Sequence, residues 1–120
     1  MATHNLLGLT GLIAAMELTL EIGVENIAAE LARKRAWFAS ALLAKNFSLL
    51  NPKPEPGNVS SITSIFQPGK DLTPLHKKLS DAGVVTSLRT DRKGQHYLRF
   101  SPHFYNTDEE LQRAVDLVEG

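Results

Sequence analysis

The opening of the chain restricts its fold most, because a long segment carries helical rather than strand periodicity. Between positions 5 and 22, apolar residues recur at helical spacing, namely Leu9, Ile13, Met16 and Leu20. Gly23 then breaks the pattern and suits the end of a helix. A second helical pattern runs from about Glu25 to Lys45. The sequence therefore predicts two consecutive helices before any strand.

The rest of the chain alternates short strand-like runs with turns rich in proline and glycine. Strands are predicted over residues 47–50, 59–66, 84–89 and 96–100, and a helix over 72–82. The tight connection Asp91 to Gly94 favours a hairpin between the last two strands. Thr107 and Glu110 form a capping box before a final amphipathic helix. We expect an α+β fold, with two N-terminal helices and then a β-β-α-β-β-α sandwich whose helices cover one face of a sheet.

Composition limits the classes of partner. With 120 residues, 42% of them apolar, the chain is long enough for one domain with a core. Thirteen Lys and Arg residues balance thirteen Asp and Glu residues, which argues against a nucleic-acid or membrane-surface partner. The two short basic runs, Arg33-Lys34-Arg35 and Arg92-Lys93, are interpreted as a solvated helix face and a loop tip.

Several kinds of site find no support in the sequence. The absence of cysteine excludes disulfides, thiolate metal sites and a cysteine nucleophile. None of the four histidines pairs with another at a zinc-ligand spacing, and His76 and His96 are interpreted as surface residues. The chain has neither an apolar stretch of membrane-spanning length nor a basic leader, so we expect a soluble cytoplasmic protein.

Arg99 is the strongest candidate for binding a ligand. Leu98 and Phe100 point to one side of the predicted strand, so Arg99 projects from the other. A guanidinium on a rigid strand can bind a carboxylate through two hydrogen bonds, although it can equally pair with an internal acid or reach water. Arg89 projects similarly from the partner strand, and the two cations repel one another unless an anion lies nearby.

The stretch before the first helix, Thr3-His4-Asn5, is a weaker candidate. A hydroxyl and helix-terminal amides there could bind a phosphate, and an ordinary helix N-cap explains the same residues.

Residues Tyr97 to Glu110, which read YLRFSPHFYNTDEE, resemble a signature near the C-terminus of class V aminotransferases, cysteine desulfurases and isopenicillin-N-epimerase-like proteins. Thr3-His4-Asn5, with the small residues that follow it, resembles the segment that leads into the small domain of these enzymes. Val85 to Arg89 resembles one of their strands. The resemblance extends over essentially the whole chain in the right order, and it implies the small domain of a fold-type I pyridoxal-phosphate (PLP) enzyme.

The resemblance also implies roles for particular residues. Arg99 matches the arginine that binds the α-carboxylate of an amino-acid substrate, and Arg89 matches a second active-site arginine. Thr3 matches the threonine that reaches the cofactor phosphate in the partner subunit of a homodimer. Residues 1–24 would form a helix that bridges to a missing large domain, and residues 25–120 would form the small C-terminal domain.

Two departures from the family limit what the chain can do. The cysteine that accepts sulfur in the desulfurases is absent, so desulfuration by that route is excluded. The large domain, with the Schiff-base lysine, is also absent. The resemblance thus implies a fragment of a transaminase, lyase or epimerase-like enzyme, inactive and without bound cofactor on its own, with apolar surface exposed along Leu6 to Met16. The alternative is a non-catalytic module that binds a small ligand or a protein.

Overall fold

The computed structural model describes residues 4–55 and 57–118, and the chain divides into two compact units between residues 30 and 31. The first unit contains helix α1 (Leu6–Ile22) and the start of helix α2 (Val24–Ala44). The Asn5 side chain caps α1 by accepting a 2.9 Å hydrogen bond from the Gly8 amide. Gly23 ends the helix at a positive φ of 90°, a conformation that favours glycine.

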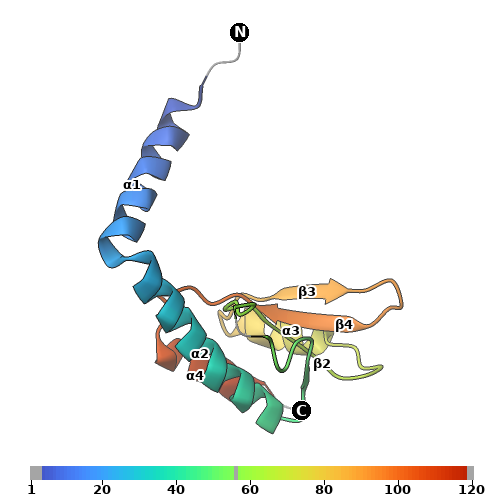
Figure 1. Ribbon diagram of the computed structural model, residues 1–120. Coiled ribbons are helices and arrows are strands. Elements are labelled where there is room, and N and C mark those ends of the chain that lie inside the picture. Colours follow the sequence, from blue (N-terminus) through green and yellow to red (C-terminus); the bar gives the residue numbers. More distant parts are fainter. Residues whose placement is uncertain (1–3, 56, 119–120) are drawn as a thin grey trace. The chain divides into compact units, whose positions relative to one another are not determined.

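The second unit is built around a four-stranded antiparallel sheet (Figure 1). After α2, its elements are β1 (Ser48–Leu49), β2 (Thr63–Phe66), α3 (Thr73–Asp81), β3 (Ser87–Thr90), β4 (His96–Phe100) and α4 (Asp108–Leu117). The strand order is β1-β2-β4-β3, so β4 is central and β3 is an edge strand that forms a hairpin with it.

One face of this sheet is covered by helices. Strand alternation turns Ile65, Leu98 and Phe100 toward a core that α2, α3 and α4 complete. The fully buried side chains of this core are Phe38, Leu42, Thr63, Ile65, Leu79, Leu98 and Val118. The opposite face carries mainly polar side chains, among them Ser87 and Arg99. The structure therefore confirms the expected α+β fold and its order of elements.

Three strands begin later than the sequence predicts, and β1 is shorter by one residue at each end. β2 begins at Thr63 rather than at residue 59, because β4 ends at Phe100, directly opposite Thr63. Residues 59–62 have no strand beside them, so their β-branched side chains do not produce a strand. β3 begins at Ser87 rather than at residue 84. The Val84 amide instead donates a 2.8 Å hydrogen bond to the Leu79 carbonyl, which keeps this segment against the end of α3.

Two of the three residues in the basic run on α2 are buried rather than solvated as the sequence suggested, whereas Arg33 is exposed and contacts Asp108. Lys34 is 3% exposed and donates a 2.7 Å hydrogen bond to the Phe104 carbonyl. Arg35 is also buried, and it donates to the Asn51 carbonyl at 2.8 Å. These cations replace hydration with contacts to loop carbonyls, so they hold two loops against α2. The other basic run, at the hairpin tip, is exposed as predicted.

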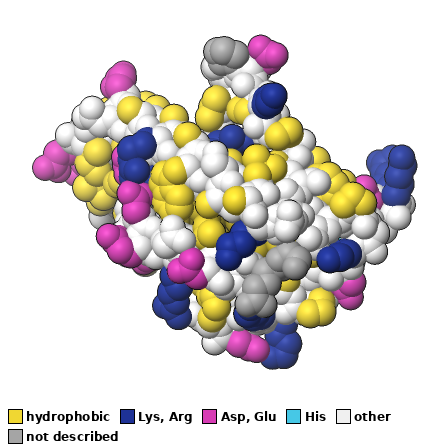
Figure 2. Space-filling model, turned by 90° about the horizontal axis from the view of Figure 1, so that it is seen from below, with side chains coloured by type: hydrophobic (Ala, Val, Ile, Leu, Met, Phe, Trp, Pro, Cys, Tyr) yellow, Lys and Arg dark blue, Asp and Glu magenta, His cyan; other side chains and the backbone are white. Residues whose placement is uncertain are grey.

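The surface mixes apolar and charged groups. Figure 2 shows hydrophobic side chains between Lys, Arg, Asp and Glu side chains on the face seen from below. None of the residues of α1 is buried, and its exposed apolar residues include Leu9, Ile13 and Met16. Among the described residues, no single helix is long and apolar enough to cross a membrane, although α1 and α2 together would pass a test of length and composition.

Candidate functional site

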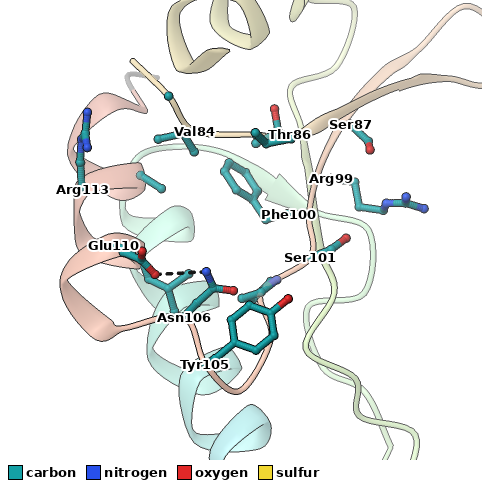
Figure 3. Close-up of a pocket in the computed structure, with 15 residues that line it drawn as sticks. Val84, Thr86, Ser87, Arg99, Phe100, Ser101, Tyr105, Asn106, Glu110 and Arg113 are labelled. Carbon is teal, nitrogen blue, oxygen red and sulfur yellow. Dashed lines mark hydrogen bonds between the residues drawn. The ribbon is translucent and has the colours of Figure 1, made fainter. Parts of the chain in front are cut away.

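A cleft of about 580 Å³ opens where β3 and β4 cease to pair. Pairing starts at Ser87 opposite Arg99, so the chain before Ser87 separates from the chain after Phe100. Pro102 lies in the second of these segments and lacks the amide that a longer strand would need. The loop around Tyr105 and the first turns of α4 complete the cleft, which Figure 3 shows in close-up. Its shape thus follows directly from the late start of β3.

Arg99 lines the cleft, and its side chain projects from the sheet face opposite the helices (Figure 3). In Figure 3 its side chain and that of Ser87 point to one side, whereas Phe100 points to the other. The guanidinium of Arg99 makes no hydrogen bond or ion pair with any residue that the structure describes, and its Nε atom is buried without a partner. A buried donor of this kind costs on the order of 1–3 kcal/mol when it stays unpaired. Arg99 is therefore a cation that the fold holds without a counter-ion among the described residues.

The other charged groups of the cleft are already engaged. Glu110 accepts hydrogen bonds from the Thr107 amide at 3.0 Å and from Asn106 Nδ2 at 3.1 Å. These bonds, that from the Thr107 backbone first, lower the pKa of the Glu110 carboxyl below its ordinary value. Arg113 donates a 2.6 Å hydrogen bond to the Ala82 carbonyl at the other end of the cleft. Neither residue neutralises Arg99.

The loop between β4 and α4 is shaped by its own hydrogen bonds. Asn106 accepts from the His103 amide at 2.8 Å and donates to Glu110, so it links the loop to the helix. The capping box predicted from Thr107 and Glu110 is present in full. Tyr105 is 70% exposed and stacks on the His103 ring, with centroids 4.5 Å apart. The loop thus presents an aromatic ring at the edge of the cleft.

The three residues that the sequence singled out lie in different places. Arg99 lines the cleft, and Arg89 does not, although it lies on the same sheet face two residues beyond Ser87. Thr3 lies outside the described residues. At the start of α1, the capping bond described above comes from Asn5.

His96 is not the simple surface residue that the sequence suggested. It is partly buried, and its Nδ1 lies 2.9 Å from Asp71 Oδ1 and 3.2 Å from the Leu72 amide nitrogen. Hydrogen bonds from Thr73 lead the contacts that lower the pKa of Asp71. No group of three His, Asp or Glu side chains suited to a metal ion occurs among the described residues.

The residues of this cleft do not fit the PLP cofactor that the resemblance implies. A Schiff base requires a lysine amine, and no lysine lines the cleft. The carboxylate of the cleft, that of Glu110, is occupied by the helix cap and does not offer a partner for a pyridinium nitrogen. The cleft offers a guanidinium, hydroxyls and an aromatic ring, which suit the binding of a small anion rather than cofactor chemistry.

Comparison with known proteins yields matches among solved structures. No family model matches the chain, and neither does any curated protein at a significant level. The crystal structure of 8-amino-7-oxononanoate synthase from Francisella tularensis matches 87% of the chain at 27% identity, with a TM-score of 0.68. A NifS-like protein matches 97% at 25% identity, with a TM-score of 0.78.

A third match shows the fold alone. The apo structure of cysteine desulfurase from Thermococcus onnurineus NA1 matches 97% of the chain at 18% identity, with a TM-score of 0.83. The chain spans about a third of the length of these three proteins, with shares of 30%, 33% and 31%. These structural neighbours are fold-type I PLP enzymes, and the chain has the fold of their small domain.

Sequence reasoning identified Arg99 but missed most of what surrounds it. Ser87, which faces Arg99 across the hairpin, could have been found by counting back from the predicted turn at Asp91 to Gly94. The roles of Asn106 and Arg113 depend on side-chain contacts that no local sequence pattern predicts.

Proposed function

We propose that this chain is the small domain of a PLP-dependent enzyme of the class V aminotransferase type, in which Arg99 binds the α-carboxylate of an amino-acid substrate. The whole enzyme would be a homodimer whose large domain holds the cofactor, and Thr3 would reach a cofactor phosphate in the partner subunit. PLP, when bound there, supplies an electron sink for bonds to the substrate Cα. By fixing the carboxylate, Arg99 would orient the substrate, which is a positioning role.

One observation carries the proposal: Arg99 lines an open cleft, and none of the residues that the structure describes is a partner for its guanidinium. Hydrogen bonding and packing explain many of the other residues in the segment from Tyr97 to Glu110. Leu98 and Phe100 build the core, and Asn106, Thr107 and Glu110 shape the loop. They do not explain why Arg99 is there. A carboxylate would supply the acceptor that its guanidinium lacks.

The exposed apolar helix α1 supports the same proposal. A helix with many exposed apolar side chains and none that is buried indicates a face that another protein segment covers. In the proposed enzyme, that segment would be the large domain. A free-standing module for binding other proteins would use the same face, but it would have no need of Arg99.

Titration with carboxylate, followed by NMR, tests the assignment. We would label the chain with ¹⁵N and follow the side-chain Nε–Hε signals of its arginines as sodium acetate replaces sodium chloride at constant ionic strength. A charge-assisted hydrogen bond contributes about 1.5–3 kcal/mol, which corresponds to a Kd on the order of 10–100 mM. The Arg99 signal should shift saturably in this range, and that of Arg113, which already donates to Ala82, should not.

The variant Arg99→Gln identifies the binding residue. We expect backbone amides lining the cleft, such as that of Ser101, to respond to acetate in the original chain and to lose this response in the variant. If acetate shifts the Nε–Hε signal of Arg99 no more than that of Arg92 at the exposed hairpin tip, the proposal is contradicted.

A further inference from the structure

Arg89 and Arg99 lie close together on one exposed sheet face. Arg99 on β4 is directly opposite Ser87 on β3, and Arg89 lies on β3 two residues after Ser87. Alternating residues of a strand point to the same face, so the two arginines are diagonal neighbours in the hairpin. Such neighbours have Cα atoms about 7–8 Å apart, well within reach of two arginine side chains.

No internal anion compensates these two cations. Within the part of the chain that the structure describes, neither arginine makes a hydrogen bond or an ion pair. The acidic residue nearest in sequence, Asp91, is engaged by other groups, and its Oδ2 lies 3.4 Å from the hydroxyl of Tyr97, which is paired with Arg89. Asp91 Oδ1 accepts from the Lys93 amide at 2.8 Å and from the Gln95 amide at 2.9 Å. The hairpin therefore holds two like charges on one face, and neither forms an ion pair with a described residue.

We infer that Arg89 supplies a second anion contact beside Arg99, so that the site takes an amino acid with a carboxylate on its side chain. This inference rests on the proposed function, because it assigns the α-carboxylate to Arg99. A ligand with two carboxylates would neutralise both guanidiniums at once. Ser87 lies on the same face, directly opposite Arg99 and two residues before Arg89, and its hydroxyl adds a donor.

A series of simple carboxylates tests the inference on the chain as it stands. The probes are acetate, malonate, succinate and glutarate, each titrated by NMR at the same ionic strength, with shifts followed at both arginines. Because Arg89 is exposed, its contact is worth little, and we expect the best dicarboxylate to bind about two- to five-fold more tightly than acetate. The affinity should depend on chain length, since both carboxylates must reach their arginine.

Two matched variants distinguish a built site from general attraction between charges. Arg89→Gln should abolish the preference for dicarboxylates while leaving acetate binding at Arg99 intact. Arg92→Gln removes an equal charge at the hairpin tip. It should change neither the preference for dicarboxylates nor the binding of acetate.

Each alternative outcome has a distinct meaning. An equal loss of the preference in both variants, or dicarboxylate binding no tighter than acetate binding, would overturn the inference and leave the role of Arg99 standing. If acetate itself fails to bind at Arg99, the proposed function fails, and this inference fails with it.

Discussion

Replacement of Lys34 by methionine probes the contact that holds the loop of the cleft in place. Lys34 is 3% exposed, and its Nζ donates a 2.7 Å hydrogen bond to the carbonyl of Phe104, which precedes Tyr105 in that loop. Methionine keeps much of the apolar stem, so Lys34→Met removes mainly the charge and the hydrogen bond. The Phe104 carbonyl then loses this donor.

The size of the effect follows from two opposing contributions. Loss of a hydrogen bond from a charged donor costs about 1.5–3 kcal/mol. Removing a buried charge returns part of its desolvation penalty. We therefore expect a net loss of about 1–2 kcal/mol in the free energy of unfolding. In a domain of this size, each kcal/mol lowers Tm by about 4–8 °C, so the melting temperature should fall by about 4–16 °C.

Thermal unfolding followed by circular dichroism measures this change, and Lys53→Met is the matched control. Lys53 is exposed in the turn after β1, so its replacement should alter stability by less than about 0.5 kcal/mol. A variant Lys34→Met as stable as the original chain, or more stable, would refute the reasoning. It would mean that desolvation of the ammonium outweighs its bond to the loop.

Three further predictions concern the helices. Thr107→Ala should destabilise the chain by about 1 kcal/mol in urea unfolding because it removes the cap of α4, and Thr107→Ser should restore most of the loss. The folded-state pKa of Glu110 lies below its ordinary value of 4.5, so its contribution to stability is present above that pH and lost as the pH falls through the lowered pKa. Glu110→Gln should flatten this acid-side dependence, and an unchanged pH profile would count against the cap. Because Leu9, Ile13 and Met16 are exposed on α1, light scattering should detect self-association, which the double variant Ile13→Glu/Met16→Glu should reduce.

Periodicity was enough to predict the fold and the direction of Arg99. The alternation of Leu98, Arg99 and Phe100 fixes which side chains enter the core, and Gly23 and Thr107 mark helix ends through local chemistry. Each of these signals acts over a few residues. The structures that these signals predict are observed because no contact with a distant segment opposes them.

The cleft could not be predicted, because it depends on contacts between distant segments. The start of β3 is set by the hydrogen bond of Val84 to α3, and local β propensity gives no sign of it. The burial of Lys34 depends on a carbonyl 70 residues away. Local sequence predicts that a run of three basic residues is solvated, so the contacts by which Lys34 and Arg35 hold the loops are apparent only from the fold.

Reaction with PLP tests the central claim that this chain contributes substrate binding and leaves the cofactor to another domain. The purified chain is incubated with PLP and reduced with borohydride, and modified lysines are mapped by mass spectrometry. We expect scattered, substoichiometric labelling of exposed lysines, because no lysine lines the cleft. A single lysine labelled stoichiometrically, with a stable visible absorption band, would contradict it and give the chain a cofactor site of its own.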